Sequence, residues 1–357
     1  IIFFHMKNLY MIFVLQNFLK KRKERLFFKG FLFLLSIGYK ALITLRNICY
    51  DKKVFSVKKV NGLVVSVGNI TAGGTGKTPF TSFLYKNLKK KTAVISRGYG
   101  SLKERSSCFL LSNQESSYEM IGDEPFLLYR KHNCFLGVGK NRFVSAEKAY
   151  ENGAEILLLD DGYQHRKIHQ DKKIVLLDQK DPFSGGYFLP RGHLRDSVHS
   201  LKRADLIAVN HADENFFTLK KELMKYTDRI IGIRPYYKGL KNLKGEKAVL
   251  DKHVKVGAFC GIGNPDPFLN YIKSRYNLVN AEVFHDHEKP SFNRLKALLN
   301  ENEGTVLICT EKDAVKIPSD CSLPICFLEM DIEIVFGKEI FQKFLENIHF
   351  EVDNLIN

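Results

Sequence analysis

The chain has 357 residues, enough for two domains of ordinary size that each bury a core. Hydrophobic residues make up 45% of it and charged residues 26%, which are globular values and exclude wholesale disorder and fibrous repeats. Lysine and arginine number 55 against 39 acidic residues, so the formal net charge is +16. Residues 1–60 carry +11 of this charge and the other 297 residues only +5. The nearly balanced body disfavours a nucleic-acid partner.

The seven cysteines form no CxxC pair and no cluster with histidine at the spacing of a zinc site. Their odd number and scattered positions are typical of reduced thiols that pack as small apolar side chains in a cytosolic protein. The pattern argues against an extracellular disulfide scaffold.

Residues 1–50 alternate apolar runs with basic residues and predict an N-terminal, membrane-associated helical segment. Its uncharged stretches are shorter than the about 18–20 residues that a spanning helix needs. The dense KKRKER charge at 20–25 follows the first apolar run, whereas a secretory signal places its charge first. The segment is therefore expected to lie on a membrane surface, not to direct export.

A helix is predicted at 27–47, with a thin polar edge and a broad apolar side. The polar edge contains Lys29, Ser36, Lys40, Thr44 and Asn47. The apolar side contains Phe31, Leu34, Leu35, Leu42 and Leu45. One interpretation is a core helix of a soluble domain. We favour membrane attachment, because the adjacent basic run suits an anionic leaflet and the apolar side suits shallow insertion.

A buried-strand pattern at 63–69 runs into the glycine-rich turn TAGGTGKT at 71–78, and Pro79 begins a helix-like segment. Strand, glycine-rich turn, GKT and helix is the order of a P-loop, although Thr71 stands where the first glycine is usual. Glycines let backbone N–H groups converge on phosphate oxygens, and the helix N-terminus adds partial positive charge. The residues predicted to bind ATP are Thr71, Ala72, Gly73, Gly74, Thr75, Gly76, Lys77 and Thr78. Lys77 would reach the β- and γ-phosphates, and the Thr78 hydroxyl would coordinate Mg²⁺.

Two adjacent aspartates end a second buried-strand pattern, EILLLDD at 155–161. A central parallel strand emerges at the carboxyl edge of its sheet, where ligands bind. Asp160 or Asp161 can hold the Mg²⁺ of a P-loop site directly or through water. The other interpretation is a helix cap or a strand-end turn.

Further clusters of reactive groups stand where apolar runs end or turns begin, as active-site residues of α/β enzymes do. They are SRGYG (96–100), GDEP (122–125), DDGYQHR (160–166), LPRGHLRD (189–196), FHDH (284–287) and TEKD (310–313). TEKD has two interpretations, a base-reading loop or a simple strand-to-helix turn.

Together with NITAGGTGKTP (69–79), FCGIGNPDPF (259–268) and TEKDAVK (310–316), these clusters occur in the order found in one enzyme family. Residues 26–316 resemble the tetraacyldisaccharide 4'-kinases, the lipid A pathway kinases of Gram-negative bacteria. The resemblance implies that the γ-phosphate of ATP passes to the 4'-hydroxyl of a tetraacylated glucosamine disaccharide 1-phosphate, giving lipid IVA.

The family motifs also imply roles for single residues. Asp123 becomes the base that takes the hydroxyl proton, with His287 as its dyad partner and Asp286 orienting the pair. From the residues alone, Asp123 is as well explained as a helix cap and His287 as a solvent-facing histidine. Lys77 and Mg²⁺ would neutralise phosphate charge, and Arg97 would assist them or form a surface ion pair.

Two further pairs of residues complete the expected site. Gln164 and His165 line the same cleft or satisfy backbone groups in a tight turn. Arg195 and Asp196 correspond to an Arg-Glu pair near the phosphates and metal in the resembled family. Asp196 is one methylene shorter than that glutamate, so the metal ligands expected are Thr78, Asp160, Asp161 and, less directly, Asp196.

Strand-like runs at 63–67, 92–96, 156–160, 174–178 and 205–209 alternate with helix-length segments. They predict an α/β fold with a P-loop NTPase-type, mainly parallel sheet and flanking helices, plus a smaller C-terminal α/β domain. The expected divisions are a membrane-associated segment at 1–50, a P-loop kinase domain at 51–231, a hinge at 232–246 and the smaller domain at 247–357. Because Asp123 and His287 fall in different domains, the cleft must close between them.

The favoured interpretation is a peripheral or monotopic lipid kinase on the cytoplasmic face of the bacterial inner membrane. Its expected partners are the lipid substrate and anionic lipids, with no nucleic acid and no obligate protein partner. The alternative is a P-loop ATPase switch or partitioning-type protein, whose GG-x-GKT loop is similar. Such a protein acts through a protein partner and needs no Asp/His base across a cleft.

Overall fold

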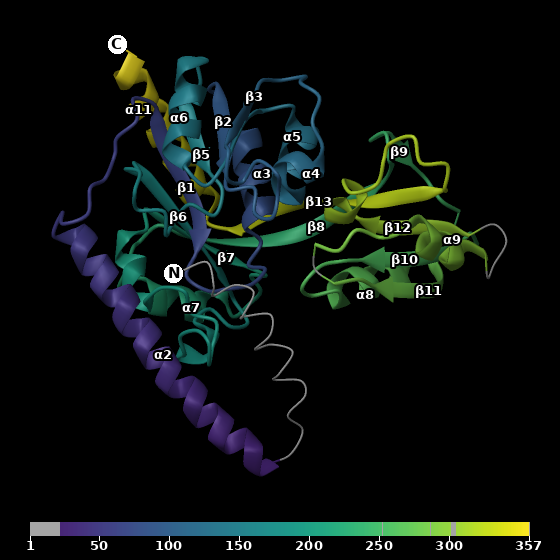
Figure 1. The fold of residues 1–357 in the computed structure, drawn as a ribbon, viewed down its shortest axis with the longest axis horizontal. Coiled ribbons are helices and arrows are strands. Elements are labelled where there is room, and N and C mark those ends of the chain that lie inside the picture. The colour runs from purple at the N-terminus through teal and green to yellow at the C-terminus, as the bar shows by residue number, and fades with distance from the viewer. Residues whose placement is uncertain (1–21, 252, 286, 301–304, 357) are drawn as a thin grey trace.

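The computed structural model describes residues 22–251, 253–285, 287–300 and 305–356. Within them, a 13-stranded sheet runs through two units that are joined by the long strands β8 and β13 (Figure 1). The predicted α/β fold, with a mainly parallel sheet, flanking helices and a smaller C-terminal unit, is confirmed.

The larger unit holds the glycine-rich turn and is called the P-loop unit below. Its strands are β1 (Leu63–Asn69), β2 (Thr92–Ser96), β3 (Cys108–Leu110), β4 (Phe135–Val138), β5 (Ile156–Leu159), β6 (Lys172–Asp178) and β7 (Leu206–Asn210). Its helices are α2 (Arg22–Asp51), α3 (Lys77–Asn87), α4 (Tyr118–Ile121), α5 (Asp123–His132), α6 (Arg142–Glu151), α7 (Phe216–Leu223) and α11 (Lys338–Ile356). Two 3₁₀ turns lie at Ser184–Gly186 and Val198–Arg203.

Strand β1 lies at the centre of the P-loop unit. The order β7-β6-β1-β5-β2-β4 is parallel throughout, and β3 pairs antiparallel at the outer edge. Every residue of β1 is buried, as expected of a strand covered on both faces. Because all these strands point the same way, their carboxyl ends bring the polar residues that follow them to one edge of the sheet.

The smaller unit has its own parallel sheet, in the order β11-β10-β12-β13. Its strands are β9 (Lys247–Ala248), β10 (Lys255–Cys260), β11 (Asn277–Val283), β12 (Val306–Thr310) and the beginning of β13 (Ile325–Phe336). Its helices are α8 (Asp266–Arg275), α9 (Phe292–Asn300) and α10 (Glu311–Ala314). Two clusters of buried apolar side chains, separate from those of the P-loop unit, form its core.

The segment expected as a hinge at 232–246 is mostly strand β8 (Ile230–Asn242). Its first residues pair with β7, and the rest pairs antiparallel with β13 from Gly232 to Asn242. The first four residues of β8, Ile230–Ile233, are buried, whereas exposed and half-buried residues alternate over residues 234–239, where the strand belongs to a two-stranded ribbon between the units. The sequence of this ribbon part therefore lacks the pattern of a core strand.

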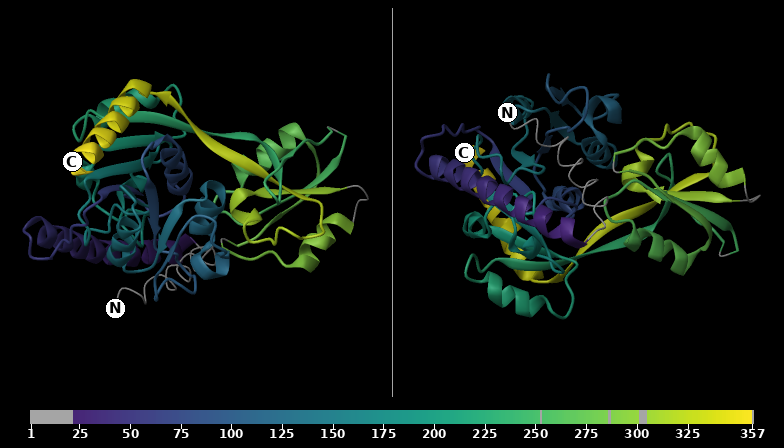
Figure 2. Two further views of the ribbon diagram at one scale, coloured as in Figure 1. Left: turned by 90° about the horizontal axis from the view of Figure 1, so that it is seen from above. Right: turned by 60° about the horizontal axis from the view of Figure 1, so that its bottom comes forward.

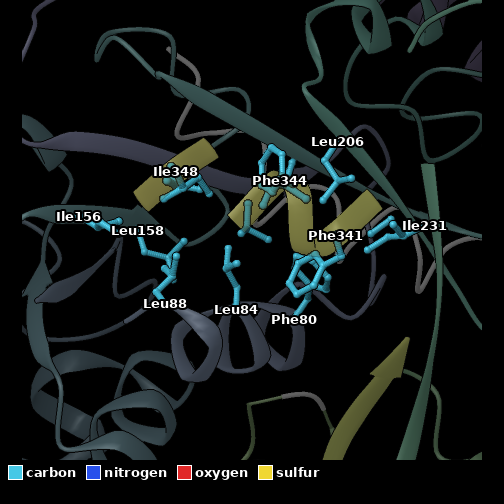
Figure 3. Packing of buried hydrophobic residues seen from close by; sticks show 14 of the residues in the cluster. Phe80, Leu84, Leu88, Ile156, Leu158, Leu206, Ile231, Phe341, Phe344 and Ile348 are labelled. Atoms are coloured by element: carbon cyan, nitrogen blue, oxygen red, sulfur yellow. The ribbon is translucent and has the colours of Figure 1, made fainter. Parts of the chain in front are cut away.

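Helix α11 packs on the P-loop unit, although the sequence-based boundary at 247–357 placed it with the smaller one. Phe341, Phe344 and Ile348 of α11 share a buried cluster with Phe80 and Leu84 of α3, between the two helices and the sheet (Figure 3). The chain returns because β13 runs back along β8 and delivers the amphipathic helix to this face. The smaller unit thus ends within β13.

Helix α2 lies at the periphery of the P-loop unit (Figure 2) and is longer than the predicted 27–47. Its apolar side is turned away from the protein: Leu34, Leu42 and Leu45 are 67%, 68% and 59% exposed. Its polar Ser36 is buried instead, and Asn47 contacts the P-loop unit. This orientation excludes the core-helix interpretation. Residues 29–51 are also long and apolar enough to cross a membrane by length and composition. The preceding residues 1–21 lie outside the described part of the chain.

We expect Phe344→Ala to lower the free energy of unfolding by about 3–5 kcal/mol, because it leaves a cavity between α11 and α3. The matched control is Phe350→Ala on the same helix, where the ring is 67% exposed. It should change stability by no more than about 0.5 kcal/mol. Urea denaturation followed by circular dichroism measures both. Equal losses in the two variants would show that α11 is not docked as described.

Candidate active site

The glycine-rich turn is held in the shape of a phosphate cradle. Gly73 and Gly76 have φ of +117° and +85°, which L side chains rarely adopt. A Cβ on Gly76 would also lie 2.7 Å from the Asn210 side-chain nitrogen. That amide donates to the Thr75 carbonyl at 3.2 Å, and the Asn69 amide donates to the Thr75 hydroxyl at 2.8 Å. The turn is thus fixed from the ends of β1 and β7.

The segment 189–196 runs beside the glycine-rich turn and brings Arg195 to it. The Ala72 N–H donates to the His193 carbonyl at 2.6 Å, and the Arg195 N–H donates to the Ile70 carbonyl at 2.8 Å. The Arg195 guanidinium binds both oxygens of Asp161, at 2.8 and 3.1 Å, and also contacts the Asn69 side-chain oxygen. The structure therefore joins the predicted residues Arg195 and Asp161 directly.

Asp160 and Asp161 follow β5 and have opposite electrostatic surroundings. Burial raises the pKa of Asp160 to about 7, and the Glu124 charge adds to this effect, while the Thr81 hydroxyl donates to it at 2.9 Å. Burial also disfavours the charge of Asp161, but Arg195 and Lys77 outweigh it and hold that pKa well below its ordinary value. Lys77 Nζ lies 3.9 Å from Asp161. The acids and the P-loop lysine form one cluster.

The donor chemistry of this cluster fits a magnesium ion. The Thr81 hydroxyl donates to Asp160, and Thr78 precedes Thr81 by about one turn of α3, so the two threonines share a face of this helix. In the described part of the chain, no group of three or more His, Cys, Asp or Glu residues could hold a metal by itself. Mg²⁺ needs no such cage, because it binds one or two carboxylates together with phosphate oxygens and water.

Asp196 is buried and its carboxylate is already engaged. It accepts hydrogen bonds from Asn47 of α2 at 2.9 Å, from the Ser197 N–H at 2.8 Å and from Arg203 at 2.9 Å. Its oxygens thus connect segment 189–196 to α2. As a metal ligand it stays a prediction.

Asp123 and His287 meet across the two units. Asp123 is the first residue of α5, after Gly122 with φ +95°, and its Oδ1 accepts the Glu124 N–H at 2.9 Å. Its Oδ2 lies 2.9 Å from Nδ1 of His287, which belongs to the loop after β11. Asp123 is therefore both an acid at a helix N-terminus and half of a dyad. Asp286, expected to orient the pair, lies outside the described residues.

The surroundings of Asp123 favour its ionised form. Burial raises the pKa of this carboxyl, but the His287 hydrogen bond and the Lys312 and Lys316 charges outweigh burial, so the pKa lies below its ordinary value. The two ammonium groups lie 3.9 and 4.0 Å from Oδ2. An ionised carboxylate can accept a proton, which a general base must do.

The remaining predicted residues lie around the same cluster. Gln164 donates to the Asn69 carbonyl at 2.6 Å, so it lines the start of the glycine-rich turn. Burial and the charge of Arg142 lower the pKa of His165 to about 3, which keeps this ring neutral. Arg97 forms an ion pair with Glu104 at 2.8 Å.

The chain is similar to known proteins in both sequence and fold. The family model of tetraacyldisaccharide-1-P 4'-kinase (LpxK) matches residues 28–349. Curated tetraacyldisaccharide 4'-kinases of Cytophaga hutchinsonii and Halothermothrix orenii are each 34% identical, over 82% and 85% of this chain and 86% and 88% of their own. The crystal structure of LpxK from Aquifex aeolicus in complex with ATP matches with a TM-score of 0.75 at 27% identity, covering 91% of this chain and 99% of that one.

The chain belongs to the tetraacyldisaccharide 4'-kinase family. It is a kinase of lipid A biosynthesis, and the resemblance inferred from the motifs is confirmed. The alternative, a nucleotide switch acting through a protein partner, is not favoured.

Some residues of this kinase site gave no clear signal in the sequence. Arg142, the first residue of α6, donates from its guanidinium to the Asp161 carbonyl at 2.9 Å. Asn210 directly follows the strand-like run predicted at 205–209, and this position at a strand end was its only, weak signal. TEKD is a strand-to-helix turn, since the Thr310 side chain caps α10, and its Lys312 reaches Glu124 of the P-loop unit at 3.4 Å.

We expect Gly76→Ala to destabilise the ATP-free kinase by about 1–3 kcal/mol, because it forces a side chain into a left-handed conformation and against Asn210. Gly74→Ala is the matched control, because its Cβ meets nothing within 4 Å. Thermal unfolding without nucleotide measures the difference. If both variants unfold at the same temperature as the wild-type protein, the turn is not constrained as described.

Proposed function

We propose that this family member transfers the γ-phosphate of ATP to the 4'-hydroxyl of a tetraacylated disaccharide 1-phosphate and so forms lipid IVA. The observation that carries the proposal is the Asp123–His287 hydrogen bond beside a P-loop. The charge of Glu124, next to Asp123, raises the pKa of Asp160. The dyad and the acids that follow β5 therefore share one electrostatic environment. A base and a phosphate cradle in one electrostatic environment suit transfer to a hydroxyl.

The reaction needs alignment and charge neutralisation more than covalent chemistry. The N–H groups of residues 71–78 and the N-terminus of α3 would bind the β- and γ-phosphates. Lys77, 17% exposed on its side chain, would neutralise charge on the transferred group. Arg195 and Arg97 would hold the phosphate side of the cleft, Arg195 through its bond to Asp161. Gln164 and His165 would shape the floor of this site.

Asp123 would act as the general base. As the sugar oxygen attacks the γ-phosphorus, its O–H proton passes to Asp123 Oδ2 or to the Asp123–His287 pair. The new O–P bond forms, and the bond between the γ-phosphorus and the β-phosphate oxygen breaks to release ADP. His287 orients the carboxylate through Nδ1 and, when protonated, stabilises the charge. Asp286 remains a proposed contributor to this orientation.

We propose Thr78, Asp160 and Asp161 as the residues that hold Mg²⁺, with Asp196 as a further contributor through its loop. When bound, the ion supplies positive charge to the phosphate oxygens. The raised pKa of Asp160 supports this assignment, since a buried carboxyl without a cation partner resists ionisation.

We place the kinase at the cytoplasmic face of the inner membrane, attached by α2. The exposed apolar side of this helix and the basic residues near its start support attachment to an anionic surface. A lipid substrate is held at such a surface, so attachment brings enzyme and substrate together without a protein partner.

The direct test is transfer of labelled γ-phosphate from ATP to the tetraacyl disaccharide 1-phosphate in detergent micelles. We expect labelled lipid from the wild-type enzyme. Asp123→Ala should lower kcat by about 10²–10⁴-fold, because it removes the base, while ATP affinity stays near wild type.

Lys77→Ala serves as the control, because it should weaken phosphate stabilisation and not proton removal. Transfer that survives Asp123→Ala, or equal loss of ATP affinity in both variants, would contradict the roles assigned here. ATP turnover raised by a protein, without labelled lipid, would instead favour a switch.

Leu34→Glu/Leu42→Glu should weaken binding to vesicles containing phosphatidylglycerol by at least about tenfold, since each leucine contributes about 1.5–3 kcal/mol when buried in lipid. Vesicle flotation measures the bound fraction. Val249→Glu is the control, because Val249 is 83% exposed and lies outside α2. Unchanged binding of the double variant would remove α2 from the membrane contact.

A further inference from the structure

Lys316 is a buried lysine at the junction of the two units. Its residue is 2% exposed, and it is among the largest fully buried side chains described. Its ammonium group lies 3.1 Å from Asp313, 3.1 Å from the Glu288 carbonyl and 4.0 Å from Oδ2 of Asp123. Three segments therefore converge on one charge.

Two of these contacts hold the smaller unit together. Asp313 accepts the Gly261 N–H at 2.9 Å and the Thr310 hydroxyl at 2.6 Å, so it ties the ends of β10 and β12. Glu288 is the residue directly after His287. By binding the Glu288 carbonyl and Asp313 at once, Lys316 attaches the loop of His287 to the frame of its own unit.

The third contact crosses to the P-loop unit. A buried ion pair contributes little stability compared with apolar residues of similar volume, because removing both charges from water is costly. The pair of Lys316 and Asp313 is thus poorly explained by stability. An apolar pair could not place positive charge 4.0 Å from Asp123.

We propose that Lys316 is a positioning residue of the phosphoryl transfer, which fixes the His287 loop against Asp123 and places a positive charge beside that carboxylate. The inference rests on the proposed role of Asp123 as the base. It assigns the TEKDAVK segment a function in base activation, beyond a turn in the fold.

The charged groups that face Asp123 set the expected pH dependence. They are His287, Lys312 and Lys316 from the smaller unit, and Glu124 beside Asp123 on α5. Lys312 shares its charge with Glu124, at 3.4 Å, and is more exposed than Lys316. The Lys316 charge is shielded from water and acts on Asp123 with less screening. Without it, Asp123 binds a proton more readily, so activity is lost as the pH falls.

The test is the pH dependence of kcat for lipid phosphorylation between about pH 5 and pH 9. In Lys316→Met the acidic limb should move to higher pH by about one unit, a tenfold loss of kcat on that limb. At the alkaline end kcat should stay within about threefold of wild type, and the KM for ATP should not change.

Lys316→Met leaves Asp313 buried without its partner and endangers folding. Lys316→Met/Asp313→Asn removes both charges and keeps an oxygen for Gly261 and Thr310, so it should fold and show the same shifted limb. The matched control is Lys131→Met. Lys131 joins the two units through Glu311 at 2.8 Å but is not among the groups that shift the pKa of Asp123. The acidic limb of the Lys131→Met pH profile should therefore stay at the wild-type pH.

An acidic limb that stays at the wild-type pH in the double variant overturns the inference, as does a loss of kcat that is equal at all pH values. Asp123→Ala separates this failure from that of the proposed function. If Asp123→Ala is inactive and the limb is unmoved, only the role of Lys316 is wrong. If Asp123→Ala is active, the assignment of the base fails first.

Discussion

The hydrogen bond between Asp123 and His287 is the contact on which the site depends, because it joins residues 164 positions apart that stand on two separate cores. A hydrogen bond needs its partners within a few tenths of an ångström, so the two units must be held in a fixed relation. The β8–β13 ribbon provides the continuous connection. Lys131–Glu311, Lys312–Glu124 and Arg130 on the Leu243 carbonyl then fix the units from the side of α5. Helix α5 thus carries both Asp123 and residues that anchor it to the smaller unit.

Helix α2 applies a related constraint to the opposite side of the site. Its apolar side chains point outward, which is unfavourable in water and favourable at a lipid surface. Its inner side buries Leu32 and Ser36 and carries polar groups that contact segment 189–196: the Asn47 amide donates to Asp196, and the Tyr39 hydroxyl donates to the Arg195 carbonyl at 3.4 Å. The helix that exposes its apolar side therefore also helps to hold Arg195, which neutralises Asp161.

What could be predicted from the sequence follows the range of the interactions involved. The P-loop is local, since Gly73, Gly76 and Lys77 lie within five residues, and β1 and β5 show continuous buried runs. Strand β8 was missed because its ribbon part at residues 234–239 contains no fully buried residue. Helix α11 was assigned to the wrong unit because the sequence of an amphipathic helix does not show which unit it packs on. The dyad came only from the family resemblance. Lys316 lacked any signal, because its chemistry depends on which segments converge on it.

The two neighbouring aspartates show how the fold separates chemically equal groups. Asp161 is neutralised by Arg195 and Lys77, so it stays ionised, whereas Asp160 is buried beside a hydroxyl and its pKa is raised to about 7. Asp123 belongs with Asp161, since lysines and His287 keep it ionised. The cationic residues thus lie beside Asp123 and Asp161, the two carboxylates that stay ionised. Asp160 lacks such compensation: the Thr81 hydroxyl and Lys77 lower its pKa, but burial and the charges of Glu124 and Asp161 outweigh them.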